Sequence, residues 1–94
     1  MSEHRSILRV LAQGEDREKQ YDWLGAVESY VKAQTSVLKQ ENFQKAGEIQ
    51  ERIGFCFQNA AMQAESREEF REKMQLSIEA YKKARGFHGM PLNK

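Results

Sequence analysis

Apolar residues recur at steps of three and four along most of this chain, which is the spacing that places side chains on one face of an α-helix. The pattern is interrupted around residues 21–22, 40–42 and 64–66, and it fades after residue 85. It therefore predicts four helices, over residues 3–20, 23–39, 43–64 and 67–85, and an irregular tail over residues 86–94. We expect a single all-α domain over residues 1–94, in which four antiparallel helices form two αα-hairpins as an array or bundle.

The apolar faces of the predicted helices define the expected core. The stripes are Ile7, Leu8, Val10 and Leu11; Trp23, Val27, Tyr30 and Val37; Ile49, Ile53, Cys56 and Phe57; and Phe70, Met74, Ile78 and Tyr81. The second helix carries another apolar row, Leu24, Val31 and Leu38, at seven-residue spacing. Two apolar faces predict that this helix contacts more than one neighbour.

Polar residues mark the expected helix ends. Asp22 and Asn42 are placed to accept hydrogen bonds from the free N–H groups of the helices that follow them. Ser66 with Glu69 three residues later predicts a capping box, and Gly86 predicts a C-terminal cap. Six pairs at i,i+4 spacing favour helix: Glu15–Lys19, Glu28–Lys32, Glu41–Lys45, Glu48–Arg52, Glu69–Lys73 and Glu79–Lys83.

Composition narrows the class of protein. Charged residues make up 31% of the chain and the formal net charge is +1, so no strong overall field favours nucleic acid or an anionic membrane. A single cysteine excludes an internal disulfide, and no apolar run approaches the roughly 20 residues of a membrane span. These features predict a cytoplasmic protein without a secretory signal, a membrane span or a nucleic-acid partner.

Candidate chemical groups are few and scattered. Cys56 lies on an apolar helix face without a nearby histidine in sequence, which is typical of a core cysteine. His4 and His88 have no ligand partner at helical spacing, and the acidic residues at 65–72 surround a helix start, where they complement its dipole. We therefore expect no catalytic residue, no metal site and no cofactor. A small enzyme would require a cleft with a titratable pair, which this sequence does not indicate.

Two eight-residue segments are similar to each other at an offset of 51 residues. Residues 26–33 read AVESYVKA and residues 77–84 read SIEAYKKA, so Glu, Tyr, Lys and Ala coincide. Small residues on either side of each tyrosine allow a neighbouring helix to come close, and the ring fills the space between them. This small–aromatic–small pattern is typical of the second helix of a packed hairpin.

The pattern resembles the tetratricopeptide repeat (TPR) family, whose second helix carries small–aromatic–small residues and whose first helix carries a glycine. Gly14 precedes Ala26 by twelve residues, the family spacing, whereas Gly54 precedes Ser77 by 23. The eleven extra residues are about three helical turns, so they lengthen helices without rotating their faces. In this respect the chain is similar to the long-helix repeats of soluble NSF attachment proteins. Arg17 stands where the family usually has an aromatic, and no proline closes either repeat.

The resemblance implies a right-handed helical array that acts as a non-catalytic adaptor or scaffold and binds a peptide or helix of a partner protein. Carried onto this chain, the groove residues are Leu8, Leu11, Glu15, Glu18, Lys19, Glu48, Glu51, Phe55, Gln58 and Asn59, with Met62 on the same face as Phe55. Three alternatives stay open. The first is a self-associating domain such as a homodimer, and the second is a regulatory fragment of a larger protein. The third is an adaptor similar to the microtubule-interacting and trafficking (MIT) domain, which would use only the first three helices.

Overall fold

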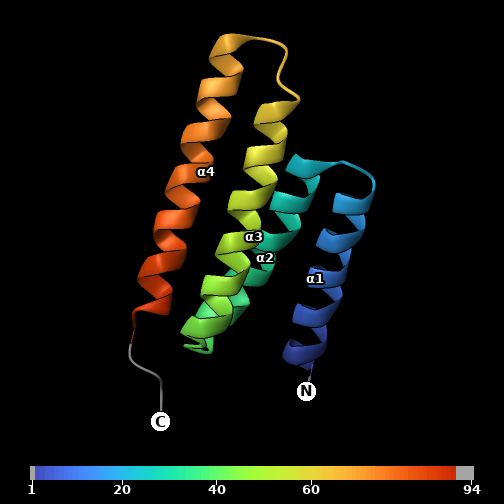
Figure 1. Cartoon of the computed structure of the whole chain (residues 1–94). Coiled ribbons are helices and arrows are strands. Elements are labelled where there is room, and N and C mark those ends of the chain that lie inside the picture. The colour runs from blue at the N-terminus through green and yellow to red at the C-terminus, as the bar shows by residue number, and fades with distance from the viewer. Residues whose placement is uncertain (1, 91–94) are drawn as a thin grey trace.

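The computed structural model describes residues 2–90, and it contains four helices in that range (Figure 1). They are α1 (Ser2–Lys19), α2 (Trp23–Lys39), α3 (Phe43–Met62) and α4 (Arg67–His88). The predicted all-α class is confirmed, and each helix starts within one residue of its predicted start. Figure 1 shows each helix running back alongside the one before it, as expected of two antiparallel hairpins.

The helices pack in sequence order. Within residues 2–90, α1 packs on α2, α2 on α3 and α3 on α4, and no other pair of helices makes extended contact. The result is a flat layer with extents of 46 × 27 × 15 Å. Because α1 and α4 do not close on each other, the four helices form an open array, and one face of α3 stays accessible between its neighbours.

The first two turns are built alike. In each, a Gln caps the helix and the next residue takes the left-handed conformation, with φ of 62° at Tyr21 and 55° at Glu41. In the first turn the N–H of Tyr21 donates to the carbonyl of Glu18 and the N–H of Asp22 donates to the carbonyl of Arg17, which is the Schellman motif. The second turn has the same two hydrogen bonds, from Glu41 to Leu38 and from Asn42 to Val37. A carboxylate or amide then starts the next helix, since Asp22 accepts from Gly25 N–H at 3.0 Å and Asn42 from Lys45 N–H at 3.1 Å. Both predicted N-caps are confirmed.

The start of α4 follows half of the predicted capping box. Ser66 Oγ accepts a hydrogen bond from Glu69 N–H at 3.0 Å, as expected. The returning carboxylate of Glu69 accepts from the N–H of Glu65 at 3.4 Å and not from Ser66 itself. The box therefore spans one more residue than the sequence pattern predicts.

The predicted ends of the last two helices are wrong. α3 ends at Met62, two residues early, and α4 continues to His88 with Gly89 as its C-cap, so Gly86 is helical and caps nothing. Tertiary contacts explain the extension. Phe87 stacks on Phe43 with ring centroids 6.4 Å apart, and His88 lies over α3. Residues 86–90 of the predicted tail are thus largely helical, and residues 91–94 lie outside the described residues.

The predicted i,i+4 ion pairs do not form, since none of the six lies within 4.0 Å. Lys45 pairs with Glu48, and Lys73 with the adjacent Glu72. Arg52 reaches across to Glu18 on α1. Surface pairs are worth only a few tenths of a kcal/mol, so a tertiary or capping partner easily displaces them.

The two hairpins are held by a tyrosine that packs on a glycine. A Cβ added at Gly14 would lie 2.6 Å from Tyr30 Cε1, and one added at Gly54 would lie 3.0 Å from the Tyr81 ring. The small residues beside each tyrosine are buried: Ala26, Ala33, Ser77 and Ala84. Ser77 also donates from Oγ to the Gly54 carbonyl at 2.8 Å. The internal repeat therefore places the same contact in both hairpins.

Two apolar rows that the pattern assigned to the core are exposed. Val31 in the second row of α2 is 50% exposed, and Ile78 in the stripe of α4 is 45% exposed. The prediction that α2 contacts more than one neighbour is confirmed, since α2 packs on both α1 and α3, but these two helices leave its second apolar row exposed. The α4 stripe is likewise only partly covered, since α4 packs on α3 alone. Leu8 of the α1 stripe is also half exposed.

Candidate functional site

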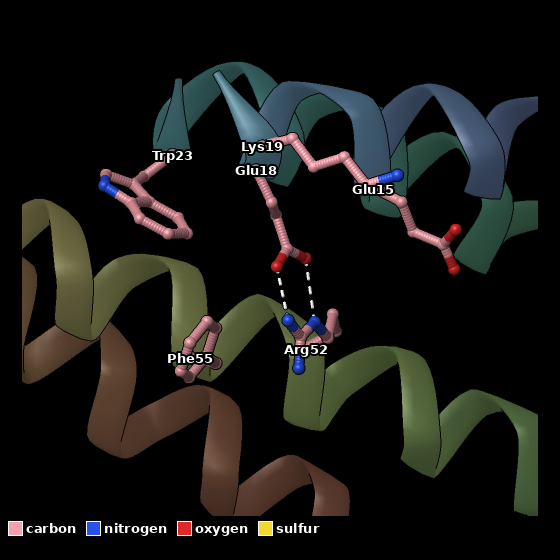
Figure 2. Close-up of a pocket in the computed structure, with 6 residues that line it drawn as sticks. All are labelled: Glu15, Glu18, Lys19, Trp23, Arg52 and Phe55. Atoms are coloured by element: carbon pink, nitrogen blue, oxygen red, sulfur yellow. Dashed lines mark hydrogen bonds and ion pairs between the residues drawn. The ribbon is translucent and has the colours of Figure 1, made fainter. Parts of the chain in front are cut away.

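A groove lies between α1 and α3 on the surface of the array (Figure 2). It has a volume of about 600 Å³ and is lined by Glu15, Glu18, Lys19, Trp23, Arg52 and Phe55. A smaller hollow of about 140 Å³ continues it along the same two helices, sharing Glu15 and Arg52 and adding Leu11 and Ile49 among its lining residues. We call the two together the α1–α3 groove.

An ion pair between the two helices forms the floor of the groove. Figure 2 shows the Glu18 carboxylate of α1 facing the Arg52 guanidinium of α3, with two hydrogen bonds between them. Arg52 Nε donates to Glu18 Oε2 at 2.8 Å, and Nη2 donates to Oε1. Tyr30 of α2 donates its hydroxyl hydrogen to the same carboxylate at 2.6 Å. One buried carboxylate thus ties together three helices.

The network sets the charge state of its members. Burial by itself raises the pKa of Glu18, but the hydrogen bonds and charge of Arg52 and the hydroxyl of Tyr30 outweigh it, so the pKa falls below its ordinary value of 4.5. Burial and the adjacent Glu18 raise the pKa of the Tyr30 phenol. Glu18 is therefore ionised and Tyr30 neutral at neutral pH, which is the state in which the carboxylate accepts from both Arg52 and Tyr30.

Aromatic rings form one wall of the groove. Trp23, the first residue of α2, meets Phe55 of α3 edge to face with centroids 5.9 Å apart. The guanidinium of Arg52 lies 4.4 Å above the Phe55 ring, which is cation–π geometry. Tyr21 meets Trp23 at 6.1 Å from the turn before α2. Because Arg52 and Glu18 satisfy each other, the unpaired charges at the rim are those of Glu15 and Lys19.

One buried donor near this wall has no acceptor. The indole N–H of Trp23 is shielded from solvent and makes no hydrogen bond to any described residue. An unsatisfied buried N–H costs roughly 1–3 kcal/mol. This donor belongs to a residue that lines the groove.

The structure brings together six of the eleven residues that the sequence predicts for a binding site. Those that line the α1–α3 groove are Leu11, Glu15, Lys19, Glu48 and Phe55, together with Glu18. The remaining ones lie elsewhere: Leu8, Glu51, Gln58, Asn59 and Met62. Glu51 contacts His88 of α4 at 3.1 Å, and Asn59 donates to the carbonyl of Phe55 in its own helix. Met62, which was predicted on the same face as Phe55, is 73% exposed near the end of α3, so of these two apolar residues only Phe55 lines the groove.

Sequence reasoning missed the residues that depend on neighbouring helices. The sequence pattern pairs Arg52 with Glu48 at i,i+4 spacing and places Trp23 in the core stripe of α2. The spacing between Glu18 and Arg52 is 34 residues, and no local pattern reveals that they meet. Trp23 and Phe43 both follow an N-cap directly, and each ring packs on a ring of the next helix in the chain, Trp23 on Phe55 of α3 and Phe43 on Phe87 of α4.

The described residues show neither an accessible thiol nor a cluster of metal ligands. Cys56 is fully buried, and burial together with the nearby Glu18 carboxylate raises the pKa of its thiol to about 12. Among the described residues, no three or more His, Cys, Asp or Glu side chains come together in a way that would hold a metal ion. None of the helices in that part of the chain combines the length and apolar character of a membrane span.

Comparison with known proteins found no similarity from which to transfer a function. No family model, curated protein or solved structure matches the chain.

Proposed function

We propose that this chain is a non-catalytic protein-interaction module, similar in design to a TPR array, and that it holds a peptide or helix of a partner protein in the α1–α3 groove. The observation that carries the proposal is the division of roles within the groove. The polar groups at its floor, those of Glu18, Tyr30 and Arg52, are hydrogen-bonded to one another. The rings of Phe55 and Trp23 offer apolar surface to a ligand, and the charges of Glu15 and Lys19 at the rim are available to pair with it.

The groove chemistry suits a short peptide segment. An apolar side chain of the ligand would contact the Phe55 ring, which is partly exposed beside Trp23. Lys19 and Glu15 stand one turn apart on α1, so they favour a ligand that carries both signs of charge at a matching spacing. A floor that is already hydrogen-bonded needs little rearrangement on binding, which reduces the entropic cost of association.

Site-specific photo-crosslinking tests the proposal. A photoreactive phenylalanine analogue at position 55 should capture a partner segment that mass spectrometry identifies, whereas the same analogue at Val31 should not, because Val31 lies on the exposed row of α2. The purified partner segment should then bind the native chain directly in calorimetry.

Substitution supplies the second measurement. Phe55→Asp should weaken the affinity for that segment at least about tenfold, because it places a charge against an apolar contact. The control Val31→Asp should leave the affinity unchanged. Equal crosslinking at both positions, or an unchanged affinity of Phe55→Asp with a native circular dichroism spectrum, would contradict the proposal.

A further inference from the structure

A second surface of the array is apolar and uncovered, and it lies on α4 away from the groove. Phe70 and Ile78 are 41% and 45% exposed, and Met74, halfway between them, is half-buried. Spacing by four residues puts all three on one face of the helix. This α4 row is bounded by no other helix of the described chain, because α4 packs on α3 alone.

The internal repeat shows which face of α2 is equivalent to the α4 row. The match of Tyr30 with Tyr81 places Val27 in register with Ile78. Val27 is only 9% exposed and belongs to the core. It shares a face of α2 with Gln34, seven residues on, and Gln34 donates to the Ala46 carbonyl and to Gln50 of α3. The face of α2 that carries Val27 is therefore covered by α3, and the equivalent face of α4 is the one left open.

Cations border the open row on one side. Arg67, Arg71, Lys82 and Arg85 are exposed. Arg71, Lys82 and Arg85 lie four or seven residues from Ile78, and Arg67 lies four residues before Arg71, so helical spacing places all four along the row. Within the described part of the chain, no carboxylate lies within 4.0 Å of any of the four. The acidic residues Glu68, Glu72 and Glu79 follow one another at steps of four and seven, on another face of the helix. The row is thus a local basic, apolar surface on a chain whose net charge is only +1.

We propose that the α4 row is a docking site for an amphipathic helix of a partner protein with acidic residues along one flank. The helix would lie on α4 as α3 lies on α2. The geometry of that existing contact describes the ligand, since α3 buries Ala46, Ile49 and Ile53, a small residue followed by two isoleucines at steps of three and four. Acidic side chains on one flank would meet the four cations. A second copy of this chain that docked through its own α4 row fits less well, because it would bring the same unpaired cations to both sides of one interface.

A designed peptide pair tests this surface independently of the groove. Both peptides are alanine-based helices of about 20 residues with the Ala-x-x-Ile-x-x-x-Ile spacing of α3. One carries glutamates on the flank and the other carries lysines at the same positions. We expect the acidic peptide to bind the native chain in fluorescence anisotropy, and the basic peptide to bind at least about tenfold more weakly.

Variants of the protein then localise the binding. Ile78→Asp should weaken acidic-peptide binding at least about tenfold, and the control Val31→Asp, at a similarly exposed position on α2, should leave it unchanged. Arg71→Glu combined with Lys82→Glu should reverse the preference toward the basic peptide. Both residues are exposed, so these variants should keep the native circular dichroism spectrum and melting temperature.

Several outcomes would overturn the proposal. They are no binding of the acidic peptide, equal binding of the two peptides, or binding that survives Ile78→Asp. Light scattering that shows a dimer lost in Ile78→Asp, without peptide binding, would assign the row to a second copy. Sedimentation with vesicles of phosphatidylserine and phosphatidylcholine that depends on Ile78, again without peptide binding, would assign it to a lipid surface.

Discussion

The tightest contact between glycine and tyrosine predicts the sign of a substitution that helix propensity alone would get wrong. Replacing glycine by alanine inside a helix normally stabilises it by up to about 1 kcal/mol. At Gly14 the added methyl group would lie 2.6 Å from Cε1 and 2.8 Å from Cζ of Tyr30. The ring cannot move aside easily, because Tyr30 is 2% exposed and its hydroxyl is bonded to Glu18. Overpacking of this kind costs about 1–3 kcal/mol.

Three glycines give a graded series with an internal control. A Cβ at Gly86 would meet nothing within 4 Å, so Gly86→Ala should raise stability by up to about 1 kcal/mol. At Gly54 the nearest atoms of Tyr81 are 3.0 Å away, and that ring is only partly buried, so Gly54→Ala should fall between the other two. Gly14→Ala should be the least stable of the three, about 1–3 kcal/mol below Gly86→Ala.

Thermal and urea unfolding, followed by circular dichroism, would measure the series. For a domain of this size the expected difference between Gly14→Ala and Gly86→Ala is roughly 5 to 20 °C in Tm. A double-mutant cycle isolates the cause, since Gly14→Ala should become stabilising once Tyr30→Ala has removed the ring. If Gly14→Ala raises Tm as much as Gly86→Ala does, the clamped ring is not what keeps position 14 a glycine.

Three further predictions follow from single contacts. Glu18→Gln should lower the free energy of unfolding at pH 7 by about 1.5–3 kcal/mol, the worth of hydrogen bonds to a charged group. Because the pKa of Glu18 is lowered on folding, this difference should be present above pH 4.5 and disappear as the pH falls through the folded-state pKa; a constant difference in urea titrations down to acid pH would refute it. Cys56 should not react with a thiol reagent at pH 8 in the native state and should react fully in denaturant, since it is buried with a pKa of about 12; rapid native labelling would show that the site opens. Ser66→Ala should cost about 1 kcal/mol through loss of the bond from Glu69 N–H, whereas Ser66→Gly should cost only a few tenths; equal effects would mean that the hydroxyl does not cap α4.

The rim charges of the groove and the cations beside the α4 row predict salt responses of different size. Binding at the α4 row should weaken steadily with ionic strength, because four cations face an acidic ligand. Binding in the groove should depend on salt less, since Lys19 and Glu15 carry opposite charges and the floor is neutral overall. The two proposed sites can therefore be separated by salt titration as well as by substitution.

Much of the fold was predictable because its signals are local. A helix start depends on one side chain and the N–H group three residues later, so Asp22, Asn42 and Ser66 could be read directly. The repeat at offset 51 was equally visible, and it correctly paired small residues with a tyrosine. Helix ends were harder to predict. α4 continues past Gly86 because Phe87 and His88 make stabilising contacts with α3.

Less of the candidate site than of the fold could be predicted from the sequence. Phe55, Glu15 and Lys19 were expected on a binding face, yet the pairing that forms its floor joins residues 34 positions apart. Helical periodicity gives each helix a face but does not say which helix covers it. For that reason Phe70 and Ile78 were assigned to the core although no helix covers them, and Met62 was grouped with Phe55 although it lies outside the groove.

The sequence by itself determined four helices, their starts, the small–aromatic–small contacts and the residues that could carry chemistry, because each of these depends on neighbours within a few positions. Only the tertiary structure decided that Glu18 binds Arg52 and Tyr30, that α1 and α3 enclose a groove, and that one face of α4 is left open. These features depend on which helices meet, and that choice is made by packing many side chains at once rather than by any single local pattern.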